Sequence, residues 1–203
     1  MIYSIYLNII VKVFILGTHI LTGSIGSGKS EAQKIFEKFN YDCFCADNIV
    51  RKLYKQENII SGIKKIIPNS VENGVINTKL LREVIFSDES KMFKVERYIQ
   101  PKVFIEFEKI LNSNVNNNII LVIPIIKKIY LNRKYKIIYI SANKKNRIKR
   151  LKDRNNYNIS LIDNIVMYQE NIDVYKNNNS FFLENNGTLE DLEESIKNII
   201  KLI

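Results

Sequence analysis

The residues with the clearest chemical potential form one Gly-rich segment near the start of the chain. The run GSIGSGKS at residues 23–30 matches G-x-x-x-x-G-K-[ST] at every fixed position. An apolar strand precedes it and an amphipathic helix follows it, which is the setting that the motif requires. Glycines let the main chain curl so that successive N–H groups face one anion, and the helix N-terminus adds partial positive charge. The segment therefore predicts a cradle for the phosphates of a nucleotide.

Single positions of this cradle have separate expected roles. Lys29 is expected to reach the β- and γ-phosphates of ATP, and the Ser30 hydroxyl to hold Mg²⁺. The backbone N–H of Glu31, one residue into the helix, is expected to help hold the α-phosphate. The predicted nucleotide-binding residues of the segment are Gly23, Gly26, Ser27, Gly28, Lys29, Ser30 and Glu31. ATP and Mg²⁺ are the cofactors that this pattern implies.

A carboxylate follows the second predicted strand, at residues 43–46. In an open parallel sheet ligands bind at the carboxyl ends of the strands, so Asp47 is expected to project toward the cradle. A carboxylate there can accept a hydroxyl proton or orient the hydroxyl for in-line attack on phosphorus. The competing interpretation is an N-cap for the helix that follows, and both roles can hold at once.

Three arginines fall at helical spacing in a basic segment near residue 150. Arg147 and Arg150 are three residues apart and Arg154 is four further, so one face of a helix can present all three. Planar guanidinium groups suit the charge that develops on a transferring phosphoryl group. The lysines between them leave a merely solvated basic face as the alternative. Polar residues at 155–158 are typical of a lid over a nucleotide.

The elements that must position these residues alternate along the chain. Strands are predicted at 19–22, 43–46, 119–123, 136–140 and 181–184, and helices at 29–39, 47–55, 58–67, 78–111, 144–152, 161–175 and 188–200. Breaks are expected in the 78–111 helix at Ser87–Asp88 and at Pro101, and a capping box at Thr188 and Asp191. This alternation predicts an α/β fold with a parallel sheet covered on both faces.

Composition limits the classes of protein. A chain of 203 residues with 46% hydrophobic and 26% charged residues is a globular domain, which excludes disordered, collagen-like and coiled-coil classes. Two cysteines and one histidine exclude His-based triads and four-ligand zinc sites, and we expect the cysteines to be reduced in the cytoplasm. The net charge of +10 favours anionic partners, although the heavy use of Ile, Asn and Lys is also what an AT-rich genome produces.

The first residues form an apolar segment that has more than one interpretation. Residues 1–16 are interrupted by Asn8 and Lys12 and fall short of the ~20 residues that a membrane-spanning helix needs. A mis-assigned upstream start or an extra strand is the favoured interpretation of residues 1–17, with a membrane anchor as the alternative. No membrane partner is expected.

An ordered set of landmarks from about Ile20 to Leu202 resembles the dephospho-coenzyme A kinases. The matching segments and residues are 21–30, 45–51, 81–88, Pro101, Val103, Pro124, Arg150, Arg154, Gln169, Asn185 and Gly187. The resemblance implies a P-loop kinase with a core at 18–56 and 118–203, a helical substrate-binding insertion at about 57–117 and a lid at about 150–165. It implies transfer of the ATP γ-phosphoryl to the ribose 3′-hydroxyl of dephospho-coenzyme A, a small-molecule substrate, in the cytoplasm and with no obligatory nucleic acid.

The same resemblance implies residue roles. Asp47 takes the place of the base, and Lys29, Arg150 and Arg154 act on the transferred group. Arg82, Asp88 and Pro124 bind the substrate, and Asn185 lies near the adenine. The chain departs from the family pattern at Cys45, Gln100, Lys128 and Asn155. Two alternatives stay open: another small P-loop kinase for a nucleoside monophosphate or small alcohol, and a basic P-loop protein that binds nucleotide or nucleic acid without transferring phosphate.

Overall fold

The computed structural model describes residues 17–114, 118–124, 135–153, 166 and 180–203. Within it the chain forms two compact units, one made of the residues up to Cys45 and from Leu111 onward, the other of Ala46–Ile110. The predicted insertion at about 57–117 falls mostly in the second unit. The predicted extra segment at 1–17 and the predicted lid at 150–165 lie largely outside the described residues, and Arg154 and Gln169 lie wholly outside them.

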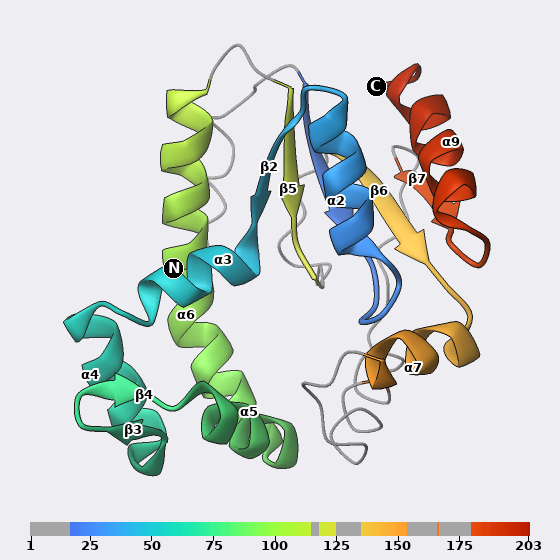
Figure 1. Ribbon diagram of the computed structural model, residues 1–203. Helices are drawn as coiled ribbons and strands as arrows, with labels where there is room; N and C mark the ends of the chain where they lie inside the picture. Colours follow the sequence, from blue (N-terminus) through green and yellow to red (C-terminus); the bar gives the residue numbers. More distant parts are fainter. Residues whose placement is uncertain (1–16, 115–117, 125–134, 154–165, 167–179) are drawn as a thin grey trace. The chain divides into compact units, whose positions relative to one another are not determined.

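The first unit contains a five-stranded parallel sheet in the order β2-β5-β1-β6-β7 (Figure 1). Its strands are β1 (Thr18–Thr22), β2 (Asp42–Cys45), β5 (Ile119–Val122), β6 (Lys136–Ser141) and β7 (Ser180–Glu184). Every residue of β1 and β5 is buried, as expected of central strands in a parallel sheet. The predicted α/β class with a parallel sheet is confirmed.

Two helices cover one face of this sheet. Ala32, Ile35 and Phe36 of α2 (Lys29–Lys38) share an apolar core with Leu192 and Ile196 of α9 (Leu189–Ile200), and residues of β1, β5, β6 and β7 complete that core. Figure 1 shows α2 and α9 beside the strands. Thr188 and Asp191 form the predicted capping box at the start of α9, with the Thr188 hydroxyl accepting from the Asp191 N–H.

The second unit is mainly helical. It contains α3 (Ala46–Leu53), α4 (Glu57–Ile66), α5 (Thr78–Ser87) and most of α6 (Glu89–Ser113). A short 3₁₀ helix at Pro68–Ser70 leads into a hairpin of β3 (Val71–Glu72) and β4 (Val75–Ile76), where the sequence predicted only a turn. Asn73 and Gly74 close this hairpin with φ of 49° and 75°, the left-handed conformation that two-residue hairpin turns require.

One of the two predicted helix breaks is confirmed and the other is wrong. α5 ends at Ser87, and Asp88 accepts from the Lys91 N–H at 3.0 Å, so it caps the next helix. α6 instead continues through Pro101. Proline removes the N–H that would pair with the Arg97 carbonyl. The helix keeps one buried face on both sides of the proline, formed by Val95, Ile99, Val103 and Phe107.

α7 (Lys144–Lys152) has the bounds that its spacing predicted. The loop predicted at 112–118 begins two residues later, because α6 extends to Ser113. Both cysteines are free thiols. Among the described helices, none combines the length and apolarity that a membrane crossing needs.

Candidate active site

The parallel register brings five strand ends to one edge of the sheet. Leu21 of β1, Val122 of β5 and Cys45 of β2 lie side by side at that edge. β6 and β7 run together to the Ser141–Glu184 pair. The phosphate loop at 23–28, Pro124, the start of α7 and Asn185 all follow these strand ends. In open α/β sheets ligands bind at the carboxyl ends of the strands, so this edge is the candidate site.

Glycines are required where the loop meets its neighbours. A side chain at Gly23 would collide with the Ile140 carbonyl oxygen, and one at Gly28 would collide with the Asn185 carboxamide. Gly28 also has φ of 105°, a conformation that L side chains rarely adopt, at the N-cap of α2. The absence of side chains at Gly23 and Gly28 thus lets the loop lie close to β6 and to the turn after β7.

The two reactive side chains of the motif lie at the start of α2. The Lys29 ammonium donates to the carbonyl oxygens of Gly23 at 2.6 Å and Ser24 at 2.9 Å, so it lies across the loop. Ser30 is exposed in the first helical turn. The Glu31 N–H donates to the Gly28 carbonyl at 3.1 Å, and its carboxylate pairs with Lys34 at the surface.

The loop and its flanking helix fit a nucleotide phosphate by their donor set. A curled main chain, one ammonium and a helix N-terminus present positive charge to an anion. No group of three or more His, Cys, Asp or Glu side chains in the described part of the chain could hold a metal ion. Mg²⁺ does not need such a cage, because it is usually bound by one or two side chains together with waters and substrate phosphates. The Ser30 hydroxyl suits that mode of binding.

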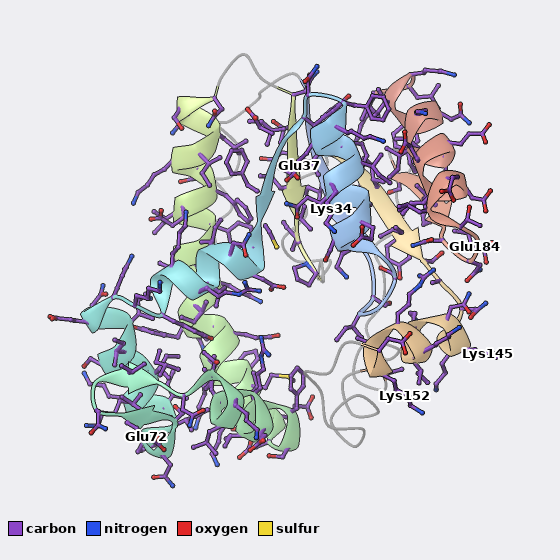
Figure 2. The ribbon with its side chains drawn as sticks, viewed as in Figure 1. Lys34, Glu37, Glu72, Lys145, Lys152 and Glu184 are labelled. Carbon is purple, nitrogen blue, oxygen red and sulfur yellow. The ribbon has the colours of Figure 1, made fainter. Side chains whose placement is uncertain are left out.

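α7 separates its arginines from its lysines. Arg147 is buried and Arg150 is half-buried, whereas Lys144, Lys145, Lys149 and Lys152 are exposed. Figure 2 shows Lys145 and Lys152 projecting from this helix. The solvated basic face and the arginine face are therefore two sides of one helix.

The Arg150 guanidinium is held against the phosphate loop. One of its NH₂ groups lies 3.4 Å from the carbonyl oxygens of Gly26 and of Ser27. The other donates to the Asn185 backbone carbonyl at 3.0 Å. Asn185 in turn donates from its carboxamide to the Ser27 carbonyl at 2.8 Å. The structure thus joins four of the predicted residues of the first unit.

The next asparagine along the turn holds the start of α7. The Asn186 side-chain oxygen accepts from the Asn143 N–H at 2.8 Å, and Asn143 itself caps α7 by accepting from the Asn146 N–H. Pro124 is half-buried two residues after β5. The sequence predicted Asn185 and Pro124 but did not predict Asn186 or Asn143.

Two predicted site residues of the second unit, Asp47 and Arg82, shift the pKa of Tyr54. Burial raises the pKa of Tyr54 to about 12, the Arg82 guanidinium lowers this pKa and the Asp47 carboxylate raises it further. Asp47 is exposed in the first turn of α3, and Arg82 is exposed on α5. Tyr54 was missed by the sequence reasoning. A signal existed, because Tyr54 follows Asp47 by seven residues, which is two helical turns and therefore the same face.

Asp88 has a structural role at the junction of α5 and α6. Hydrogen bonds from the Lys91 N–H and from its ammonium hold the pKa of Asp88 below its ordinary value. The Lys91 ammonium lies 3.2 Å from the carboxylate. This capping geometry explains the acidic residue without any ligand.

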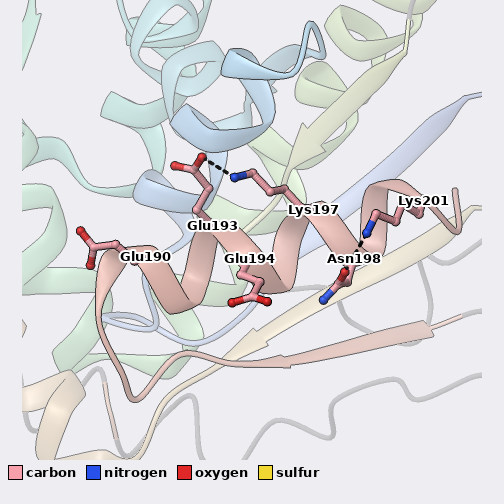
Figure 3. Close-up of a pocket in the computed structure, with 6 residues that line it drawn as sticks. All are labelled: Glu190, Glu193, Glu194, Lys197, Asn198 and Lys201. Atoms are coloured by element: carbon pink, nitrogen blue, oxygen red, sulfur yellow. Dashed lines mark hydrogen bonds and ion pairs between the residues drawn. The ribbon is translucent and has the colours of Figure 1, made fainter.

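A hollow along α9 does not involve the predicted site residues. It is lined by Glu190, Glu193, Glu194, Lys197, Asn198 and Lys201 (Figure 3). Glu193 is already paired with Lys38 at 2.7 Å and Lys197 at 3.1 Å, and these partners lower its pKa. None of the predicted site residues lines this hollow.

Known proteins are similar to this chain in sequence and in fold. The family model described as dephospho-CoA kinase matches residues 17–191. A Fusobacterium nucleatum protein named dephospho-CoA kinase is 25% identical over 186 residues, which cover 90% of this chain and 96% of that protein. A Bartonella quintana protein of the same name is 40% identical over 83 residues, covering 41% of this chain and 43% of that protein.

Two solved structures bear on the fold. A Thermus thermophilus protein has a TM-score of 0.72 at 22% identity, covering 92% of this chain and 97% of its own. A dephospho-CoA kinase from Campylobacter jejuni has a TM-score of 0.55 at 17% identity, covering 92% of this chain and 98% of its own. These likenesses show the fold, and the match of the family model over residues 17–191 shows the family. This chain belongs to the dephospho-CoA kinase family.

Proposed function

We propose that this protein is a dephospho-CoA kinase that transfers the γ-phosphoryl group of ATP to the ribose 3′-hydroxyl of dephospho-CoA. The observation that carries the proposal is the phosphate loop, held by Lys29, Arg150 and Asn185, in a chain that belongs to this family. Coenzyme A and ADP are the products. The proposed partners are small molecules, without an obligatory nucleic acid or membrane, in the cytoplasm.

The first unit supplies the groups for the phosphoryl donor. The loop amides at 23–28 and the Lys29 ammonium bind the β- and γ-phosphates, and the amide of Glu31 contributes at the α-phosphate. Mg²⁺, held through the Ser30 hydroxyl, neutralises phosphate charge when it is bound. Arg150, together with Arg154, stabilises the charge that develops on the transferring group.

The second unit and Pro124 supply the groups for the acceptor. Asp47 accepts the proton of the attacking hydroxyl or orients that hydroxyl toward phosphorus. The Arg82 guanidinium binds an anionic group of the acceptor, and Asp88 and Pro124 also contribute to acceptor binding. A lid at about 150–165 excludes water, which otherwise competes as the acceptor.

The direct test is turnover. The protein is incubated with ATP, Mg²⁺ and dephospho-CoA, and the product is identified by its mass. We expect coenzyme A, and we expect Asp47→Asn to lower turnover by at least ~100-fold while ATP still binds. Glu57→Gln, which changes an exposed carboxylate on α4 of the same unit, is the matched control and should retain full turnover.

A test of several acceptors separates the remaining candidate functions. Phosphorylation of a nucleoside monophosphate or of a small alcohol, with dephospho-CoA untouched, would assign another P-loop kinase. Salt-dependent binding of RNA without any phosphotransfer would instead assign the basic binding protein that the net charge of +10 left open.

A further inference from the structure

Asn185 is anchored in the sheet rather than presented to solvent. It directly follows β7 and is only 6% exposed. Its N–H donates to the Ser141 carbonyl at 2.7 Å, which fixes its main chain to the last residue of β6. A carboxamide on such a fixed backbone has a defined direction.

Both ends of this carboxamide are occupied by groups of the protein. The nitrogen donates to the Ser27 carbonyl at 2.8 Å, and the oxygen lies 3.4 Å from a guanidinium nitrogen of Arg150. Gly28 leaves room for this approach, because a side chain there would occupy the position of the carboxamide. Asn185 therefore shapes the loop at the point where the main chain enters α2.

The shortest of these hydrogen bonds of Arg150 goes to the main-chain carbonyl of Asn185, at 3.0 Å. The carboxamide oxygen of Asn185 and the carbonyls of Gly26 and Ser27 each lie 3.4 Å from the guanidinium, so the side chain adds a second contact from the same residue. An arginine loses considerable rotamer freedom when it binds an anion. A guanidinium that is already held in place meets the phosphates without that loss at the moment of reaction.

We propose that Asn185 is a positioning residue for phosphoryl transfer, which holds Arg150 and the 26–28 segment of the loop in a single arrangement. Its carboxamide acts through these two groups and not by reading the nucleotide base. The inference rests on the proposed function for its kinetic consequence, but the network itself concerns nucleotide binding. The contacts span α7, the loop and the end of β7, all within the first unit.

The test is a double-mutant cycle of Asn185→Ala and Arg150→Ala. We expect Asn185→Ala to lower kcat by about 10- to 100-fold with dephospho-CoA as acceptor. Asn185→Ala removes the carboxamide contacts with Arg150 and Ser27 and keeps the main-chain carbonyl. Because part of its effect passes through Arg150, the loss in the double variant should be smaller than the product of the two single losses. Effects that multiply, or an Asn185→Ala variant with unchanged kcat, would overturn the proposal. Asn198→Ala, which changes an exposed asparagine on α9, is the control with unchanged kcat.

The ATP affinities of the same variants are also measured by isothermal titration calorimetry, which requires no acceptor. A wild-type protein that binds ATP but does not phosphorylate dephospho-CoA would contradict the proposed function while the coupling between Asn185 and Arg150 is still measured. If Asn185→Ala does not fold, Asn185→Asp preserves the shape but not the donor to Ser27. We expect it to weaken ATP binding by at least about tenfold at a temperature well below the Tm of the variant, and unchanged binding would overturn the proposal.

Discussion

The two units of this protein hold their predicted site residues in different ways. In the first, Lys29, Arg150 and Asn185 are tied to the loop by hydrogen bonds to main-chain carbonyls. In the second, Asp47 and Arg82 are exposed on separate helices and share only their electrostatic effect on Tyr54. The residues proposed for the phosphoryl donor are therefore held by hydrogen bonds to the main chain, whereas those proposed for the acceptor are carried on helices.

The proposed function accounts for this difference by what each set of residues would recognise. A phosphate is nearly the same in every nucleotide, so a fixed main chain can bind it, and fixed donors need no reorganisation during the reaction. Acceptors differ in shape, and side chains on helices can be exchanged without disturbing a backbone cradle. We therefore expect substitutions in the phosphate loop to affect transfer to every acceptor, and a substitution of Arg82 to affect the binding of one substrate.

The largest effect is expected at the centre of the cradle. Lys29→Ala should lower kcat/KM by about 10²–10³-fold for any acceptor, because it removes one preorganised donor from the phosphates. The value of kcat/KM for ATP is measured by steady-state kinetics at saturating dephospho-CoA. Lys34→Ala removes an exposed lysine that pairs with Glu31 on the same helix and should be neutral. A Lys29→Ala variant with normal kinetics would remove the loop from the mechanism.

The second-largest effect is expected on the free energy of unfolding, through the buried His19 of β1. Burial, and secondarily Lys136, lowers the pKa of His19 from 6.5 to about 4. The unfolded chain takes up a proton near pH 6.5 and the folded chain does not, so stability is full above that pH and falls as the pH drops toward 4. At pH 5 the loss should be about 2 kcal/mol relative to pH 7. Urea unfolding at both pH values measures it.

His19 is the chain's only histidine and lies in β1, so the second unit makes no such contribution. His19→Gln should remove this part of the pH dependence. An equally steep loss of stability in that variant would assign the effect to carboxylates instead.

A smaller effect is expected at the acceptor. Arg82→Ala should raise KM for dephospho-CoA by about tenfold, because an exposed guanidinium contributes one charge-assisted contact. KM for ATP should stay unchanged, which distinguishes the units. Arg97→Ala, at an exposed position on α6 of the same unit, is the control. Equal increases in both KM values would contradict the division between the units.

The smallest effect is expected at Asp88, where a cap and a substrate contact can be separated. Asp88→Ala should lower Tm by about 2–4 °C, because it removes the acceptor for the Lys91 N–H. Asp88→Ser retains a cap and should retain Tm. Since neither variant keeps the carboxylate, both should raise KM for dephospho-CoA if Asp88 also binds the acceptor. Unchanged KM in both would leave Asp88 as a cap alone.

Local patterns were sufficient for much of the fold. The strands around β1 and β5 were visible as apolar runs, and α7 and the capping box at Thr188 were visible from spacing. The prediction of a break at Pro101 was wrong, because the packing of the buried face of α6 on both sides of the proline outweighs one missing hydrogen bond. The β3–β4 hairpin was missed because its strands are only two residues long and show no alternation.

The sequence by itself determined the phosphate cradle, because the spacing of glycines, lysine and serine sets the path of a short stretch of backbone. It also placed the sheet, because buried parallel strands need continuous apolar runs. Only the tertiary structure decided that Arg150 faces the loop while its neighbouring lysines face solvent, and that Asn185 joins the two. Ser27 and Asn185 are 158 residues apart, and a contact over that distance depends on how the whole sheet is ordered, which no local pattern records.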